Sequence, residues 1–282
     1  MSVLFPRLLG LGTGDSNRFT MAMEYYGYPT LAELMLFWSL DETAWRTCFR
    51  TLRRVLTTFR RHPAVFSKDE YREFFIQKLR GRIAEFLSSP TLDEHVLTAE
   101  FINVNGVRLL NCPNVIETIE PALMKGFEPN DFCLMHGDLC FSNVLYDPHS
   151  GVIRLIDARG SFGTPPGIFG DQKYDLAKLV HSTVGQYDYF IAGLFSVAKV
   201  GAGSYRLQIS RRANYALLKG LTTELIAEMG YDFNFIFLIT GTLFLSMTPL
   251  HSDSPERQLA LYLHGLQLVN SALGVCDYES LY

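Results

Sequence analysis

The pattern of apolar and polar positions predicts a short β-rich beginning followed by a mainly helical body. Residues 3–9 and 18–26 are apolar or β-prone, and residues 10–16 between them have the composition of a turn. Residues 103–107 carry the Asn-Gly signal of a tight hairpin. Between residues 132 and 156, three short apolar runs are separated by a polar loop and a turn, which predicts a small β-insert within the helical body.

Capping signals predict where the first helices begin. Thr30-Leu-Ala-Glu33 and Ser67-Lys-Asp-Glu70 are capping-box sequences, and they start helices that run to about residues 40 and 88. A third helix lies between these two, over residues 41–61. After a Gly- and Pro-rich loop at residues 158–170 the pattern is helical to the end of the chain. The remaining expected helices are residues 113–127, 174–199, 208–229, 233–247 and 255–273.

Composition places the chain among globular proteins with a large core. Of its 282 residues 48% are hydrophobic and 19% are charged, and 25 basic against 29 acidic residues give a net charge of −4. This balance argues against a nucleic-acid partner held by bulk charge. The five cysteines follow no pairing or metal-binding pattern, and the first residues lack the features of a signal peptide. We therefore expect reduced thiols and a cytoplasmic location.

Two segments allow more than one interpretation. Residues 233–250 form an uncharged segment that is long enough for a membrane span. Polar residues and Pro249 interrupt this segment. We expect a buried core helix there and no membrane span. The helix at residues 41–61 places most of its arginines along one side, which predicts a solvated basic face or a contact with an acidic partner. These arginines are Arg46, Arg50, Arg53, Arg54, Arg60 and Arg61.

The residues with the clearest chemical meaning lie between positions 136 and 157. Asp138 and Asn143 are five residues apart in a loop between two apolar runs, and Asp157 ends the hairpin that follows. All three side chains can therefore face one cleft. Two carboxylates and a carboxamide are hard oxygen ligands that suit Mg²⁺. A carboxylate that does not bind the metal can orient an alcohol and accept its proton, which is the arrangement of phosphoryl transfer in kinases.

These motifs resemble those of the aminoglycoside phosphotransferases and choline kinases, relatives of the protein kinases. The resemblance lies in His136-Gly-Asp138, Asn143 and Ile156-Asp157. Phosphotransferase-like proteins of capsule and surface-polysaccharide biosynthesis are more similar still. With them the chain shares residues 139–143, the Asp-Ala-Arg-Gly continuation at 157–160, the Tyr-Asp-Leu-Ala-Lys segment at 174–178 and residues 245–251.

The resemblance implies an α+β, protein-kinase-like fold that uses ATP and Mg²⁺. Asp138 would be the catalytic base, and Asn143 and Asp157 the magnesium ligands. His136 would organise the loop and Asp175 would brace it by hydrogen bonds. The resemblance also places Glu24, Tyr25 and Tyr26 in the inter-lobe segment that meets the adenine. Arg159 would contact a substrate phosphate or carboxylate, or form an ion pair with Asp171 or Asp175.

The chain departs from these kinases at its amino-terminal end. Only 22 residues precede Met23, no lysine occurs before Lys68, and the phosphate-covering loop and the Lys–Glu pair are missing from their expected place. Residues 10–15 are Gly-rich, but they lack the Gly-Lys-Ser/Thr of a P-loop and are expected to be a plain turn. The chain is then a partial form of a longer protein or a variant with a minimal amino-terminal lobe.

We therefore predict an ATP- and Mg²⁺-dependent kinase acting on a hydroxyl of a small molecule, a sugar or sugar-like alcohol. Residues 1–29 would hold the remnant lobe and hinge, and residues 30–282 the helical lobe, with the acceptor near Tyr187, His251 and Asp253. The alternative is a catalytically impaired kinase-like module that binds or scaffolds. A metal-dependent hydrolase is less favoured, because His149 and His181 are poorly placed to add ligands near Asp138. The sequence does not decide the oligomeric state.

Overall fold

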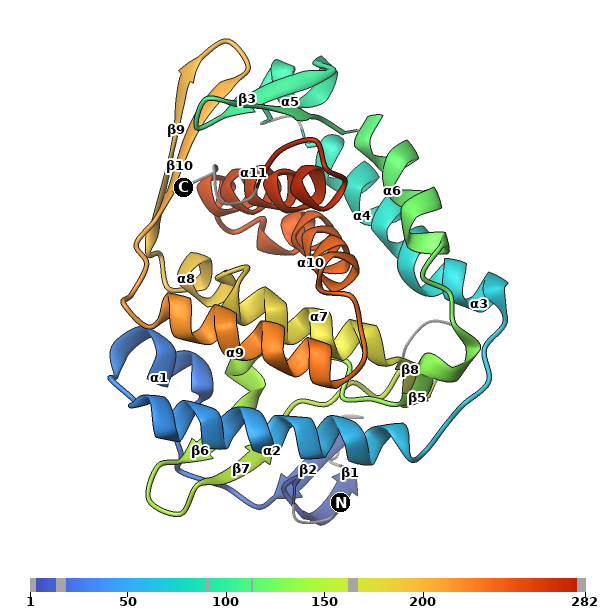
Figure 1. The fold of residues 1–282 in the computed structure, drawn as a ribbon, viewed down its shortest axis with the longest axis vertical. Helices are drawn as coiled ribbons and strands as arrows, with labels where there is room; N and C mark the ends of the chain where they lie inside the picture. The colour runs from blue at the N-terminus through green and yellow to red at the C-terminus, as the bar shows by residue number, and fades with distance from the viewer. Residues whose placement is uncertain (1–3, 14–18, 90–91, 113, 162–166, 278–282) are drawn as a thin grey trace.

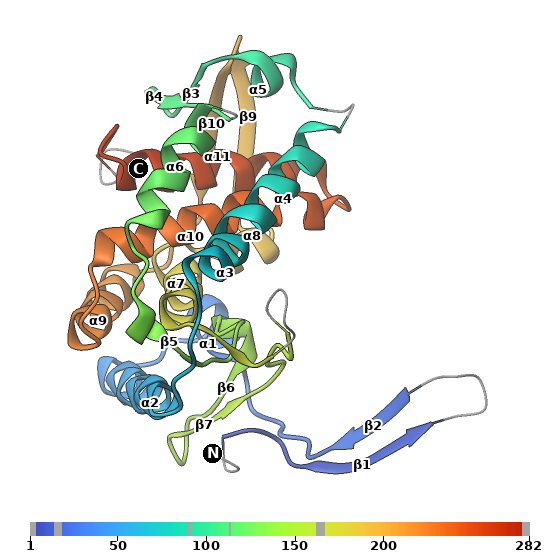
Figure 2. The ribbon, with the colours of Figure 1, turned by 90° about the vertical axis from the view of Figure 1, so that its right-hand side faces the viewer.

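A computed structural model describes residues 4–13, 19–89, 92–112, 114–161 and 167–277. A body of packed helices carries three small β-sheets, and a two-stranded ribbon extends from it (Figures 1 and 2). The expected α+β class is confirmed, with a minimal amino-terminal β-portion and a β-insert within the helical part. The division of the chain after residue 29 into two domains stays a prediction.

The helices begin at the capping residues that the sequence indicates. Thr30 and Ser67 each form a complete capping box, and the side chain of Asp41 accepts a hydrogen bond from the backbone of Ala44. The first of these helices ends at residue 37 and not near 40. The resulting elements are α1 (Leu31–Phe37), α2 (Glu42–Arg60), and α3 (Lys68–Arg72) joined to α4 (Lys78–Leu87) by a π-helical turn, Glu73–Gln77.

The centre of the body is a helix whose residues are all buried. Helix α7 (Gln172–Thr183) packs against α10 (Phe233–Met247), which in turn packs against α4 and α11 (Pro255–Ala272). A fully buried helix has to find a partner for each polar side chain. The remaining helices surround this core. They are α5 (Glu94–Thr98), α6 (Asn114–Met124), α8 (Tyr187–Ile191) and α9 (Tyr215–Glu228).

The uncharged segment forms a helix of the core. By length and hydropathy, residues Phe233–His251 would be long enough to cross a membrane. In the structure, ten consecutive residues, 236–245, are buried within the protein. Figure 1 shows α10 enclosed between α7 and α11. The expectation of a core helix therefore agrees with the packing of this chain.

Close contact between α10 and α11 depends on glycine. A Cβ added at Gly241 would lie 2.7 Å from Cγ2 of Val269 and 3.0 Å from its backbone nitrogen. We expect Gly241→Ala to lower the free energy of unfolding by about 1–3 kcal/mol, because the two helices must separate. On the exposed side of α9, a Cβ at Gly220 meets nothing within 4 Å.

Gly220→Ala is therefore the matched control, and it should raise the free energy of unfolding by about 0.5–1 kcal/mol through helix propensity alone. Urea denaturation of both variants checks the pair. Equal effects of the two substitutions would contradict the close packing of α10 on α11.

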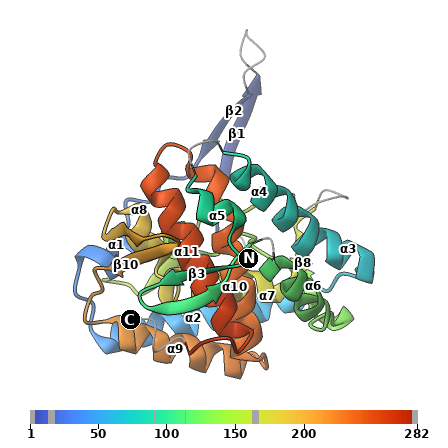
Figure 3. The ribbon, with the colours of Figure 1, turned by 90° about the horizontal axis from the view of Figure 1, so that it is seen from above.

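The first strand of the amino-terminal ribbon lies further along the chain than the sequence indicates, and both strands are shorter than expected. Strands β1 (Leu8–Thr13) and β2 (Phe19–Met23) pair antiparallel, with Gly10 opposite Ala22 and Gly12 opposite Thr20. Residues 10–13 are therefore strand, so their assignment to a turn is wrong, while residues 14–18 lie outside the described residues. Gly10 and Gly12 stay extended because each pairs with a residue of β2. The ribbon projects from the body (Figures 2 and 3).

A second hairpin inside the carboxy-terminal half is a correction to the helical expectation. Strands β9 (Phe195–Gly201) and β10 (Ser204–Ile209) replace the end of the expected helix at 174–199 and the start of the one at 208–229. Strand β10 pairs in parallel with β3 (Phe101–Val104), whose Asn-Gly turn leads into β4 (Val107–Leu110) as expected. The four strands form one sheet in the order β4-β3-β10-β9. Strands β9 and β10 pair antiparallel with each other as a local hairpin, and β10 also pairs with β3 at residues 204 and 205.

Two short strand pairs frame the loop between residues 134 and 144. Strand β5 (Phe132–Leu134) pairs with β8 (Phe169–Asp171), so the carboxyl end of the expected 158–170 loop is strand. Strands β6 (Val144–Asp147) and β7 (Val152–Leu155) form the expected hairpin around the turn at 147–151. The loop therefore begins and ends on paired strands, which fixes its two ends.

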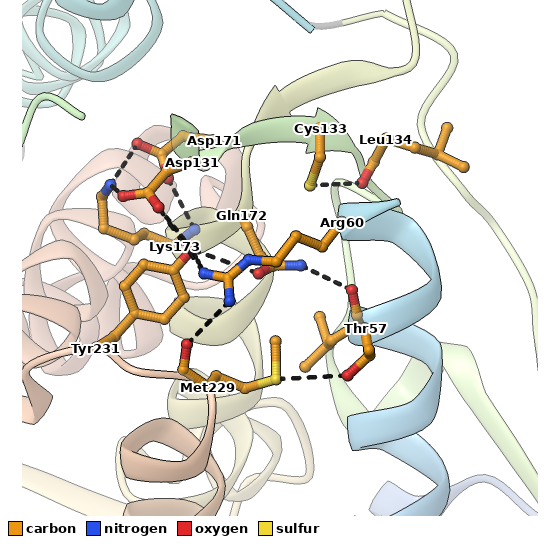
Figure 4. A network of polar contacts seen from close by, with 11 residues as sticks. Thr57, Arg60, Asp131, Cys133, Leu134, Asp171, Gln172, Lys173, Met229 and Tyr231 are labelled. Carbon is orange, nitrogen blue, oxygen red and sulfur yellow. Dashed lines mark hydrogen bonds and ion pairs between the residues drawn. The ribbon is translucent and has the colours of Figure 1, made fainter. Parts of the chain in front are cut away.

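A buried polar network anchors the start of α7 (Figure 4). Lys173 pairs with Asp131 and lies 3.1 Å from Asp171, while Gln172 donates to the backbone oxygen of Leu56 at 2.8 Å. Burial raises the pKa of Asp171 to about 7, against the opposing charge of Lys173. The network ties α7 to α2 and to the β5–β8 pair, and so it sets the position of the residues that α7 presents further along.

The basic side of α2 has its acidic partner within the same chain. Arg46 lies 3.6 Å and Arg53 lies 2.8 Å from glutamates of α9, Glu224 and Glu228 respectively. These side chains are 42–58% exposed, so each pair contributes little on its own. Arg46 and Arg53 are thus partly exposed to solvent and also pair with glutamates of α9.

Candidate active site

The loop between β5 and β6 is held in place by the carboxylate of Asp175. This carboxylate is buried in α7 and accepts hydrogen bonds from the backbone nitrogens of His136 and Gly137, both at 2.7 Å. Burial raises the pKa of Asp175, and the two donors work against that effect. Residue 137 has a φ of 78°, a conformation that glycine adopts without strain. The chain can therefore turn sharply here, directly before Asp138.

His136 lies inside this loop and does not face solvent. Its Nδ1 accepts a hydrogen bond from the backbone nitrogen of Asp138 at 3.2 Å, and its ring stacks on Phe5 with 6.1 Å between centroids. Burial lowers the pKa of His136, so the ring is neutral at pH 7. His136 therefore supports the loop from the interior of the protein through this hydrogen bond and this ring contact.

Asp138 is oriented by a lysine that the sequence analysis did not single out. Nζ of Lys178, on α7, lies 2.9 Å from Oδ1 of Asp138, and the lysine side chain is only 5% exposed. Burial alone would raise the pKa of Asp138, but the charges of Lys178 and Arg159 outweigh burial and lower it. The carboxylate is therefore ionised at neutral pH. Helix α7 therefore contacts the loop twice: Asp175 accepts hydrogen bonds from its backbone, and Lys178, three residues later, pairs with the side chain of Asp138.

Asn143 and Asp157 are brought together by hydrogen bonds between backbone groups. The nitrogen of Ile156 donates to the oxygen of Asn143 at 3.0 Å, and that of Arg159 donates to the oxygen of His136 at 2.9 Å. Asp157 lies between these two bonds with a φ of 58°, the left-handed region that non-glycine residues seldom adopt. Such strain concentrates at functional sites. The hairpin thus returns Asp157 to the loop, as the sequence predicts.

The three oxygen-bearing residues share one cavity. Asp138, Asn143, Asp157 and Arg159 all line a hollow of about 260 Å³, which Tyr187 and residues of α10 also line. The amide nitrogen of Asn143 donates to the backbone oxygen of Asp138 at 2.9 Å, so its oxygen is directed away from that carbonyl. All three residues therefore line one cavity, while their catalytic roles stay a prediction.

This donor set fits Mg²⁺ held partly by a substrate. Among the described residues, no group of three or more His, Cys, Asp or Glu side chains could hold a metal ion. Asn143 and Asp157 offer two oxygens, and Mg²⁺ is commonly bound by one or two such ligands together with water and phosphate oxygens. The site therefore suits a magnesium ion that arrives with a nucleotide. It does not suit a zinc or calcium site built from protein ligands alone.

Arg159 faces the cavity, and the two carboxylates considered as its partners are engaged elsewhere. Asp171 contacts Lys173, and Asp175 accepts from two backbone amides. The alternative of an ion pair with either residue is therefore not seen. Its presence in the cavity lining agrees with a role in contacting an anionic group of a substrate.

Two lysines of the cavity were missed because they come from distant helices. Lys178 belongs to α7 and Lys78 is the first residue of α4. A signal for Lys178 was present in the sequence: it follows Asp175 by three residues, which places both side chains on one side of a helix. No local pattern marks Lys78, because its position depends on how α4 packs against α10.

The expected hinge residues lie outside this cavity lining. The carboxylate of Glu24 accepts hydrogen bonds from the backbone of Arg7 at 3.1 Å and from the hydroxyl of Tyr26 at 2.6 Å. The Tyr26 hydroxyl and the Arg7 donors lower the pKa of Glu24 to about 2. Tyr25 is 91% exposed. Contact of this segment with an adenine stays a prediction.

The other candidate residues divide between the cavity wall and the rest of the protein. Tyr187 lines the cavity, and its hydroxyl lies 3.2 Å from Nε2 of His251. Asp253 points to solvent and pairs with Arg257. His181 is buried against Tyr187, and His149 is exposed in the β6–β7 turn. Neither histidine lines the cavity that contains Asp138, Asn143 and Asp157.

No family model matches the chain, and no curated protein matches it. Among solved structures, the chain is similar to the crystal structure of an aminoglycoside-3'-phosphotransferase of type VIII. The identity is 17%, the match covers 95% of this chain and 74% of the other, and the TM-score is 0.41. At this identity and score the similarity is distant, and it carries no information about the substrate.

Proposed function

We propose that the protein is an ATP- and Mg²⁺-dependent phosphotransferase acting on a hydroxyl of a small molecule, a sugar or sugar-like alcohol used in polysaccharide biosynthesis. The supporting observation is that Asp138, Asn143 and Asp157 meet in one cavity, with the loop braced by Asp175. A folded chain has no structural need for two carboxylates facing one hollow. We place the protein in the cytoplasm, where ATP is available.

In this proposal each residue has a separate task. The hydroxyl oxygen of the acceptor attacks the terminal phosphorus of ATP, the bond from that phosphorus to the bridging oxygen breaks, and ADP leaves. Asp138 orients the hydroxyl and takes its proton, and Lys178 keeps the carboxylate in one direction. Asn143 and Asp157 would hold Mg²⁺, which neutralises charge on the phosphates when bound.

The second candidate, a kinase-like module that binds a partner without catalysis, is favoured by the amino-terminal ribbon. Strands β1 and β2 pair only with each other among the described residues, and they leave large apolar side chains exposed. Leu11 is 74% and Phe19 is 86% exposed. Exposed apolar surface of this extent is typical of interaction sites. A binding module without catalysis does not explain why Asp138, Asn143 and Asp157 line one cavity.

A thermal-shift titration separates the two. We expect ATP to raise the melting temperature only when Mg²⁺ is present, because a ligand that binds the native state and not the unfolded chain stabilises the native state. Asp157→Ala should remove this metal-dependent rise. Transfer of labelled phosphate from ATP to a panel of sugars and polyols then tests the reaction, with Asp157→Ala as the blank.

The matched control is Asp147→Ala. Asp147 belongs to the same β-insert, but its carboxylate bonds to the turn at His149 and Ser150. This variant should keep the metal-dependent shift. Equal melting temperatures of the wild-type protein with and without Mg·ATP would reject the kinase and favour the scaffolding module.

A further inference from the structure

The cavity that contains Asp138 carries more positive than negative side chains. Lys78, Arg159 and Lys178 line it together with two carboxylates, Asp138 and Asp157. They come from α4, from the loop after β7 and from α7, so the packing of separate elements brings them together. Lys178 is already paired with Asp138. Two cations, Lys78 and Arg159, and one carboxylate, that of Asp157, therefore remain at the cavity wall.

These two cations lack an ion-pair partner in the part of the chain that the structure describes. They also line a second hollow of about 300 Å³, which shares Tyr174 with the first. One carboxylate, that of Glu73, lines this second hollow. Lys78 and Arg159 thus stand at the boundary between the space next to Asp138 and an adjoining space large enough for a substituent.

Burial and the neighbouring cations make the charged form of Lys78 less favourable. Loss of hydration, followed by the charges of Arg159, Lys178 and Arg82, lowers the pKa of Lys78 to about 8, against the opposing charge of Asp138. A bound anion would relieve the repulsion. Phosphate and carboxylate oxygens are the groups that a guanidinium and an ammonium recognise.

We infer that the acceptor is an alcohol that itself carries a phosphate or carboxylate group, which Lys78 and Arg159 hold while its hydroxyl lies at Asp138. This inference rests on the proposed function and names its substrate class. The nucleotide phosphates would instead lie at Asn143 and Asp157, on the side of the cavity formed by the β-insert. An amino sugar, being a cation, is disfavoured in this cavity because its charge would meet Lys78 and Arg159.

Direct binding tests the inference without turnover. Calorimetric titration in the absence of ATP compares a neutral hexose, its 6-phosphate, the corresponding hexuronate and the amino hexose. We expect an anionic sugar to bind at least ~10-fold more tightly than the neutral one, as charge-assisted hydrogen bonds allow. The phosphate and carboxylate arms show which anion is preferred. Lys78→Met should weaken anion binding by ~10-fold or more, and Lys78→Arg should restore most of it.

Arg80→Met is the matched control, because Arg80 lies on the same helix and pairs with Glu117 and Glu120 outside the cavity. It should leave sugar binding unchanged. Tighter binding of the neutral or amino hexose, or an effect of Lys78→Met on the KM for ATP and not on the acceptor, overturns the inference. Transfer to a neutral hexose alone would overturn it and leave the kinase standing. Anion binding through Lys78 without any transfer would reject the kinase and keep the anion site.

The pH dependence offers a second readout for an anionic acceptor. Because the ammonium of Lys78 loses its proton near pH 8, kcat/KM for that acceptor should fall as pH rises through about 8 in the wild-type protein. The fall should move to higher pH in Lys78→Arg, since a guanidinium stays protonated. An unchanged profile in Lys78→Arg would remove Lys78 from the acceptor site.

Discussion

Asp138→Asn should reduce kcat for phosphate transfer by ~10²- to 10⁴-fold, which is the usual contribution of a positioned general base. Asparagine keeps the size of the side chain but cannot take a proton. Binding of Mg·ATP should persist, because Asn143 and Asp157 are untouched. Measurement of kcat together with the metal-dependent thermal shift checks both parts. Full activity of the variant would remove Asp138 from the reaction.

Stability has to be separated from chemistry in this variant, because Asp138 is paired with a buried lysine. Removing the carboxylate leaves Lys178, which is 5% exposed, without its partner. A fully buried pair costs about 3–5 kcal/mol when one partner is removed, and this pair should cost less because Asp138 borders the cavity. The ion pair therefore predicts a measurable loss of stability in addition to the loss of activity.

The double variant Asp138→Asn/Lys178→Met resolves the two effects. Removing the unpaired ammonium should recover most of the unfolding free energy, while activity stays lost. If the double variant regained transfer, the loss in Asp138→Asn would be a consequence of the stranded lysine. The proton-accepting role would then belong to another group.

The sequence predicts those residues of the site that lie close together along the chain. Asp138, Asn143 and Asp157 lie within one loop and the hairpin that follows, so spacing and turn signals were enough to bring them together. Asp175 was identified through the resemblance, and the structure shows the two hydrogen bonds that it accepts. Lys78 could not be identified, because it reaches the cavity only through the packing of α4 against α10.

The fold shows the same division between local and long-range information. The capped helices at Thr30 and Ser67 and the Asn-Gly hairpin follow from neighbouring residues alone. Strands β9 and β10 form a hairpin with each other, but its place in the sheet does not follow from neighbouring residues, because β10 pairs in parallel with β3, about a hundred residues earlier. The sheet that a hairpin joins depends on long-range packing.

The second large effect concerns Asp175, which acts through the loop and not on the substrate. In Asp175→Ala the two buried backbone nitrogens at positions 136 and 137 lose their acceptors. An unsatisfied buried donor costs about 1–3 kcal/mol, so we expect the free energy of unfolding to fall by about 2–5 kcal/mol. The loop would also lose its fixed geometry, so kcat should fall at temperatures where the variant is still folded. Urea denaturation and kinetics well below the melting temperature measure the two effects.

Ser182→Ala separates a specific effect on Asp138 from a general loss of loop support. Ser182 is buried in the same helix, and its hydroxyl accepts a hydrogen bond from the backbone nitrogen of Phe141 at 2.9 Å, in the same loop but beyond Asp138. It should cost about 1 kcal/mol of stability and change kcat little. Asp175→Asn keeps one acceptor oxygen but points an amide at the second nitrogen, so its kcat should lie between that of Asp175→Ala and the wild type. If Ser182→Ala lowered kcat as much as Asp175→Ala, any loosening of the loop would suffice. The Asp175 bonds to residues 136 and 137 would then have no special part in placing the base.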